Sequence, residues 1–143
     1  MIAPAILRQY EVARKRGWDR MYWAVDLHGT LILPNYRDDE LPTTYYAHGQ
    51  ETMGLLSARS DVVLIMYTCS WPKEIKQYLD VFRADGIEFD YVNKNPEVDS
   101  EGYGFYNDKP YFNVLLDDKA GFDPEQHWKE IGSILPDLPL LTV

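Results

Sequence analysis

The sequence predicts an α/β fold in which one mainly parallel sheet lies between two layers of helices, a three-layer α/β/α sandwich. Two observations carry this prediction. Short apolar segments, typical of buried strands, alternate along the chain with longer segments whose apolar residues recur at helical spacing. Polar residues directly follow three of the apolar segments, and open parallel sheets bind ligands at the carboxyl ends of their strands. We therefore expect a functional site at that edge of the sheet.

The helices are predicted from their periodicity and their end signals. Proline suits the first turn of a helix and glycine its end, and the first and third helical segments carry both in these places. In the last segment, Asp123 is expected to cap the helix and Gln126 to close a capping box. The predicted helices cover 4–16, about 50–59, 72–86 and a segment that starts at Asp123.

Four short segments rich in apolar and aromatic residues are predicted to be strands. They cover 21–25, 62–67, 89–92 and 111–116. Because helical segments separate the first three strands, the expected sheet is parallel and Rossmann-like. A long loop over 93–110 separates the last two strands, and loops of this length are usually functional. The length of 143 residues fits one domain, 1–143, with a core over about 18–135 and a tail over 136–143.

Composition and charge argue against some classes of function. The 23 acidic residues outnumber the 14 basic ones, and the net charge of −9 argues against binding to nucleic-acid backbones or anionic membranes. No apolar run reaches the roughly 20 residues that a membrane span needs. The single cysteine, Cys69, cannot form an internal disulfide, which favours a reducing compartment such as the cytoplasm.

Polar residues at three predicted strand ends indicate metal and phosphate chemistry. Asp26 follows the first strand, Thr68 ends the second, and Asp117 and Asp118 follow the fourth. Carboxylates gathered at one edge repel one another unless a cation lies between them, and oxygen ligands at an open site favour Mg2+. A carboxylate held there can act as a nucleophile toward a phosphoryl group, and a lysine is needed to neutralise the remaining phosphate charge.

The motifs at these strand ends resemble those of the haloacid dehalogenase (HAD) superfamily. Segment 26–31 (DLHGTL) is similar to its first motif, segment 64–68 (LIMYT) to its second and segment 115–118 (LLDD) to its acidic fourth. More narrowly, Thr68-Cys69, segment 93–96 (NKNP) and segment 117–120 (DDKA) resemble small hydrolases of this superfamily from bacteria and phages that have no cap domain. The resemblance spans about 21–128, and it implies a phosphomonoester hydrolase without a separate cap.

The resemblance also implies a set of metal ligands. Asp26 would be both the nucleophile and a ligand to Mg2+, and the main-chain carbonyl of His28 a second ligand. Asp118 would be the third ligand from the protein. Asp117 would lie close by, either as a ligand through water or as a partner of the lysine.

The phosphoryl group would be held by other residues. Thr68 would bind it, helped by backbone N–H groups near Leu27 and Cys69. Two lysines are candidates for its remaining charge. Lys94, just after the third strand, is favoured by its place at the carboxyl edge, whereas the narrower resemblance favours Lys109.

One departure from the superfamily leaves two alternatives open. The position that normally carries a second aspartate, which protonates the leaving group and then activates water, is His28. A histidine can serve as acid and then base near neutral pH. The alternative is a module that binds phosphate with little or no turnover.

The substrate and the partners also remain open at this stage. The expected substrate is a small phosphorylated metabolite or a nucleotide, and a polynucleotide 3′-phosphatase is a further alternative. Acids 38–40 are placed where a flap over the site could lie, and the apolar tail permits a homodimer. Aromatic residues in the predicted loops could stack on a base: Tyr36, Tyr45, Tyr46, Trp71, Tyr103, Phe105 and Tyr106.

Overall fold

The computed structural model describes residues 1–35, 40–99, 101–102 and 104–142. Tyr36, Asp38, Asp39 and Tyr103, which the sequence suggested for a flap or for stacking, lie outside the described residues. The helices are α1 (Ala3–Arg16), α2 (Gly49–Ser57), α3 (Pro72–Ala84) and α4 (His127–Ile134), with short 3-10 helices η1 (Asp118–Ala120) and η2 (Leu135–Asp137). The strands are β1 (Met21–Val25), β2 (Val62–Met66), β3 (Tyr91–Val92) and β4 (Val114–Leu116).

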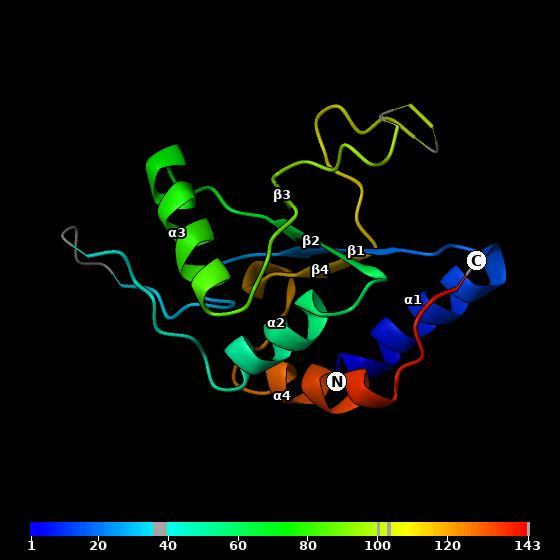
Figure 1. Ribbon diagram of the computed structural model, residues 1–143, viewed down its shortest axis with the longest axis horizontal. Helices are drawn as coiled ribbons and strands as arrows, with labels where there is room; N and C mark the ends of the chain where they lie inside the picture. Colours follow the sequence, from blue (N-terminus) through cyan, green and yellow to red (C-terminus); the bar gives the residue numbers. More distant parts are fainter. Residues whose placement is uncertain (36–39, 100, 103, 143) are drawn as a thin grey trace.

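The strands form one parallel sheet in the order β3-β2-β1-β4. Trp23 of β1 pairs with Leu64 of β2 on one side and with Val114 of β4 on the other, so β1 is one of the two interior strands. Figure 1 shows α2 and α4 together below the sheet, and segments 93–99 and 104–110 above it. The predicted α/β fold with a parallel, Rossmann-like sheet is confirmed.

Two strands are shorter than the sequence predicts because side chains replace their backbone partners. The Oδ1 atom of Asn113 accepts the N–H of Tyr22 at 2.8 Å, where a continued strand would offer a carbonyl. On the other edge, Oδ2 of Asp90 accepts the N–H of Leu64 at 2.9 Å. The pairing that defines β4 and β3 therefore begins only after Asn113 and Asp90.

The predicted capping box at the start of α4 is wrong. The helix begins at His127, and its N-cap residue, Gln126, makes no capping bond through its side chain. The side chain of Asp123 instead accepts the N–H of Glu125 at 3.0 Å, and its own N–H donates to Nδ1 of His127 at 2.9 Å. The histidine ring thus folds back over the turn and occupies the place expected for Gln126.

The helices bury their apolar faces in one core, which also supports the loop after β1. Tyr78 and Phe82 of α3 are both buried. On α4, the buried indole of Trp128 donates from Nε1 to the carbonyl of Thr30 at 2.7 Å. This bond fixes the loop that follows β1. None of the helices within the described ranges is long and apolar enough to cross a membrane.

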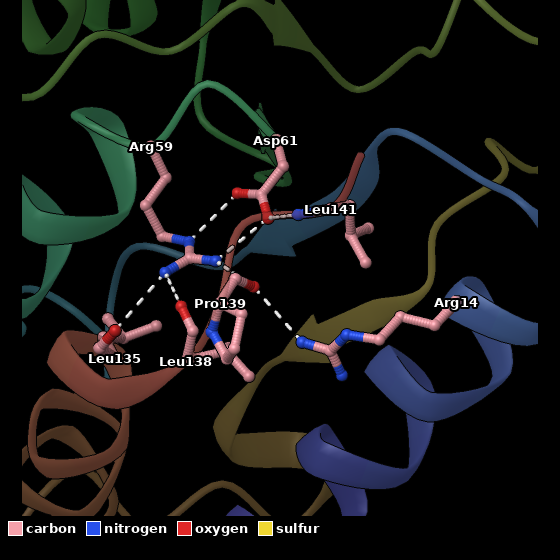
Figure 2. Close-up of polar contacts among 7 residues, drawn as sticks. All are labelled: Arg14, Arg59, Asp61, Leu135, Leu138, Pro139 and Leu141. Atoms are coloured by element: carbon pink, nitrogen blue, oxygen red, sulfur yellow. Dashed lines mark hydrogen bonds and ion pairs between the residues drawn. The ribbon is translucent and has the colours of Figure 1, made fainter. Parts of the chain in front are cut away.

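The C-terminal tail is anchored by one buried ion pair (Figure 2). Arg59 and Asp61 lie before β2, with side chains 11% and 1% exposed, and are 2.9 Å apart. Arg59 donates to the carbonyl of Leu138 at 2.8 Å, and Asp61 accepts the N–H of Leu141 at 3.0 Å. The tail is therefore tied to the amino end of the sheet, opposite the edge where Asp26 lies.

Candidate functional site

The three acidic residues predicted at the strand ends lie together. Val25 pairs with Leu116 in the sheet, so Asp26 and Asp117 follow paired positions on neighbouring strands. The N–H of Asp26 continues the pairing by donating to the carbonyl of Leu116 at 2.9 Å. One carboxylate oxygen from each of Asp26, Asp117 and Asp118 lies within 4.8 Å of the other two. This spacing suits three oxygens around one divalent cation.

A buried hydroxyl links two of these acids, and the sequence alone did not indicate it. Oγ1 of Thr30 lies 3.0 Å from Oδ2 of Asp26 and 3.3 Å from Oδ1 of Asp118. The same oxygen accepts the N–H of Asp118 at 2.9 Å. The hydroxyl has one hydrogen, so it donates to one carboxylate at a time. Thr30 therefore fixes the distance between Asp26 and Asp118 from a fully buried position.

The turn after β1 brings backbone as well as side chains to the site. The carbonyl of Leu27 accepts the N–H groups of Thr30, Leu31 and Ile32, so the chain folds tightly. The backbone N–H of Leu27 also bonds to the Asp26 carboxylate. Gly29 has φ of +84°, a conformation that residues with a Cβ rarely adopt. The backbone N–H of Leu27 thus lies at the Asp26 carboxylate, while the side chain of Leu27 is buried.

The electrostatics of the cluster favour a cation. Burial is the main reason why the pKa of Asp26 is raised to about 6, and the nearby Asp117 and Asp118 raise it further. The Thr30 hydroxyl and the Leu27 N–H act in the opposite direction by stabilising the charged form. A divalent cation would remove the repulsion among the carboxylates. The donor set is made of oxygen atoms only, and it therefore fits the Mg2+ that the sequence predicts.

A pocket of about 370 Å³ opens over this cluster and gathers several of the predicted residues. Its walls are formed by the segments that follow β1, β2 and β4. Tyr67, Asn93 and Lys119 were not predicted to belong to the site. The residues that line the pocket are Asp26, His28, Tyr67, Thr68, Cys69, Asn93, Asp117 and Lys119.

Asn93 holds the segment that carries Thr68. It has a left-handed conformation with φ of +55°, and its amide accepts the N–H of Thr68 and donates to the carbonyl of Thr68, both at 2.8 Å. The hydroxyl of Thr68 lies 2.8 Å from that of Ser70 and accepts the Ser70 N–H at 3.2 Å. Thr68 is therefore fixed in place, and the exposed Cys69 is held beside it.

The two predicted lysines do not line the pocket that holds Asp26. Lys94 and Lys109 instead line a neighbouring pocket of about 250 Å³, and Asn93 lines both pockets. The lysine in the Asp26 pocket is Lys119, whose backbone N–H donates to Asp117 at 2.9 Å. Its place directly after the two aspartates was visible in the sequence, although nothing there marked it as a phosphate ligand.

The side chain of His28 points from the pocket toward α3. Its Nε2 atom lies 2.7 Å from the hydroxyl of Tyr78, and the two rings meet edge to face with centroids 5.5 Å apart. Burial lowers the pKa of His28, while the carboxylate of Glu74 acts in the opposite direction. One ring nitrogen of His28 is thus engaged with the protein core.

Comparison with known proteins supports the fold. No family model matches the chain, and no curated protein matches it at a significant level. Among solved structures, the chain is similar to a conserved protein coded by a locus of Bacteroides thetaiotaomicron, with 24% sequence identity and a TM-score of 0.64. The match covers 82% of this chain and 91% of that one. At this identity the likeness extends to the fold and carries no activity with it.

Proposed function

We propose that the protein is a Mg2+-dependent phosphomonoester hydrolase that acts through an aspartyl-phosphate. The observation that supports the proposal most is the position of Asp26. Its carboxylate lies at the carboxyl end of the interior strand β1, in a pocket, with oxygens of Asp117 and Asp118 within 4.8 Å. The small pocket suits a phosphorylated metabolite or a nucleotide as the substrate.

The chain offers three carboxylates as oxygen ligands for the ion. Asp26, Asp118 and the main-chain carbonyl of His28 would hold Mg2+, with Asp117 binding directly or through water. Mg2+ bound there would supply positive charge to offset the negative charge of the phosphoryl group. The hydroxyl of Thr30 positions two of these carboxylates, those of Asp26 and Asp118.

The chemistry assigned to the residues proceeds in two steps. The Asp26 carboxylate attacks phosphorus, the bond between phosphorus and the leaving-group oxygen breaks, and that oxygen takes up a proton from His28 or from water. A water molecule then attacks the phosphorus of the acyl phosphate and gives up a proton to His28 or to solvent, which releases inorganic phosphate and restores the Asp26 carboxylate. Thr68 and Lys119 would bind phosphoryl oxygens, since both line the pocket with Asp26.

A panel of phosphate esters tests this proposal. Hydrolysis of p-nitrophenyl phosphate and nucleoside monophosphates should require Mg2+, should stop when EDTA is added and should be absent in Asp26→Asn. Asp80→Asn is the matched control, because Asp80 is an exposed carboxylate on α3 that does not line the pocket. Absence of activity on the whole panel in a folded protein would exclude the hydrolase.

A phosphate-binding module is the second candidate, and the contact of His28 favours it. Because Nε2 of His28 is engaged by Tyr78, the histidine has only one nitrogen left for proton transfer. In that case calorimetry should detect Mg2+-dependent binding of inorganic phosphate without turnover of esters. A large gain in rate in His28→Asp would then indicate that the natural site lacks its acid.

The pocket beside the Asp26 pocket is relevant to a further candidate activity, that of a polynucleotide 3′-phosphatase. Lys94 and Lys109 line it, and it shares Asn93 with the Asp26 pocket, so an extended anionic substrate could occupy both. Comparing a 3′-phosphorylated oligonucleotide with a mononucleotide separates this activity from the first proposal.

We further propose that the protein works in the cytoplasm, because its one cysteine, Cys69, is exposed and unpaired.

A further inference from the structure

The ring of Tyr78 is one of the most firmly held groups near the site. It is fully buried and stacks on Phe82 one helical turn away, with centroids 5.6 Å apart and an interplanar angle of 12°. Its hydroxyl is 2.7 Å from Nε2 of His28, and within the described ranges it has no other hydrogen-bond partner. The packing of the core therefore fixes the position of the Tyr78 hydroxyl, and the hydrogen bond to this hydroxyl orients the ring of His28.

This contact selects one tautomer of His28. A buried hydroxyl needs an acceptor for its proton, and among the described residues the only acceptor bonded to the Tyr78 hydroxyl is Nε2 of His28. A tyrosine hydroxyl has an ordinary pKa of about 10, so it keeps that proton at neutral pH. If Nε2 carried a hydrogen, the Tyr78 proton would be left without a partner. Nε2 therefore accepts, and the ring hydrogen of neutral His28 is on Nδ1.

We propose that Tyr78 is a positioning residue that holds His28 as the Nδ1–H tautomer, so that Nδ1 donates a hydrogen bond to an oxygen of the phosphorylated substrate. His28 lines the pocket with Asp26, and in the described part of the chain Nδ1 has no partner of its own. The proposal rests on the proposed function for its substrate. The tautomer itself does not depend on activity and is measured separately.

Nitrogen-15 NMR of the three histidines tests the tautomer, with His28→Gln used for assignment. His127 serves as a reference in the same spectrum. Its Nδ1 accepts the N–H of Asp123 at 2.9 Å, so when neutral it carries its hydrogen on Nε2. We expect the neutral forms of His28 and His127 to show opposite patterns, and His28 to shift toward the Nε2–H pattern in Tyr78→Phe. A His28 that carries its hydrogen on Nε2 in the wild type would overturn the proposal.

Kinetics test the positioning role. Tyr78→Phe keeps the ring and its stacking on Phe82 and removes only the hydroxyl. We expect kcat to fall about tenfold, the effect of one lost positioned hydrogen bond, with a smaller change in KM. Tyr45→Phe is the matched control, since Tyr45 also packs on Phe82 and its hydroxyl donates to Asp85 at 2.7 Å outside the pocket.

A double-variant comparison separates positioning from a general loss of stability. In the background of His28→Gln, Tyr78→Phe should cause no further fall in kcat, because the group that it positions is gone. An equal fall in kcat in both backgrounds would show that Tyr78 acts only through its packing in the core. If no ester is hydrolysed by the wild type, the proposed function fails, while the NMR result still decides whether Tyr78 sets the tautomer.

Discussion

Gly29 faces the carboxylate of Asp118 so closely that no side chain fits between them. A Cβ on Gly29 would lie 2.8 Å from Oδ2 of Asp118 and 3.2 Å from its Cγ. The glycine also has φ of +84°, so a substitution meets both backbone strain and a steric clash with a proposed metal ligand. The tight turn after β1 thus defines where the carboxylate of Asp118 lies.

Gly29→Ala should weaken Mg2+ binding, because the new methyl group displaces the Asp118 carboxylate. Gly86→Ala is the matched control, since Gly86 has φ of +83° and nothing lies within 4 Å of a Cβ there. We expect about 1 kcal/mol of strain in each variant and a loss of Mg2+ affinity only in the first. Thermal unfolding and calorimetric titration measure the two effects. Equal Mg2+ affinities would contradict the placement of Asp118.

Thr30→Val should reduce Mg2+ affinity by about tenfold, because it removes the hydroxyl that positions two ligating carboxylates. Thr52→Val tests whether the effect is specific. Thr52 is also buried and donates a hydrogen bond, to the carbonyl of Trp128 at 2.9 Å, but it has no contact with the acids. Both variants should lose stability, whereas only Thr30→Val should change the calorimetric titration with Mg2+. A normal titration for Thr30→Val would show that its hydroxyl plays no part in the metal site.

The raised pKa of Asp26 predicts a pH-dependent stability in the metal-free protein. Its ordinary value of 3.8 is raised to about 6 in the folded state, so the folded state binds this proton more tightly than the unfolded state. The resulting stability is fully present below the ordinary pKa and is lost as the pH rises through about 6. Denaturant unfolding in EDTA at several pH values measures this loss.

Added Mg2+ should reverse that loss, since the ion favours the charged carboxylate that burial disfavours. The stabilisation by Mg2+ should therefore be greater near about pH 7 than near about pH 5. Asp26→Asn should remove most of both effects, because its amide does not titrate. A wild type that Mg2+ stabilises equally at the two pH values would contradict the role of Asp26 as a ligand.

Arg59→Met should destabilise the fold by about 3–5 kcal/mol, because it leaves the buried charge of Asp61 unpaired. It also removes the bonds that hold the C-terminal tail (Figure 2). Arg20→Met is the control, since Arg20 pairs with Glu97 at the surface, where water screens the ion pair and its contribution to stability is small. Urea unfolding compares the two, and equal losses would show that the buried pair does not anchor the tail.

The sequence predicted features that repeat or that follow a motif. Periodicity located the helices and the parallel sheet, and the motif after the first strand located Asp26, while its partners followed from the same strand-end pattern. The sequence could not predict contacts between segments that are far apart in the chain. The bond from Tyr78 to His28 joins residues 50 positions apart, and helical periodicity marks Tyr78 only as a core residue. Nor could the sequence show that Lys94 and Lys109 line a neighbouring pocket while Lys119 lines that of Asp26, because the segments that carry these lysines have no periodic pattern.

Side chains that replace backbone partners explain the remaining errors. Asn113 and Asp90 shorten two strands because their side chains accept bonds that a carbonyl accepts in a regular sheet. The ring of His127 displaces the expected capping box in the same way. Each of these replacements depends on the rotamer of a single side chain, which amino-acid preferences do not determine.

Mass spectrometry of an acid-quenched reaction tests the central claim most directly. The protein is mixed with Mg2+ and an excess of p-nitrophenyl phosphate, quenched within the first turnover and digested. The account predicts that the peptide containing Asp26 gains the mass of one phosphoryl group, with no gain in Asp26→Asn or in EDTA. Hydrolysis of the ester with no modified Asp26 peptide, or with the phosphoryl group on another residue, would contradict it.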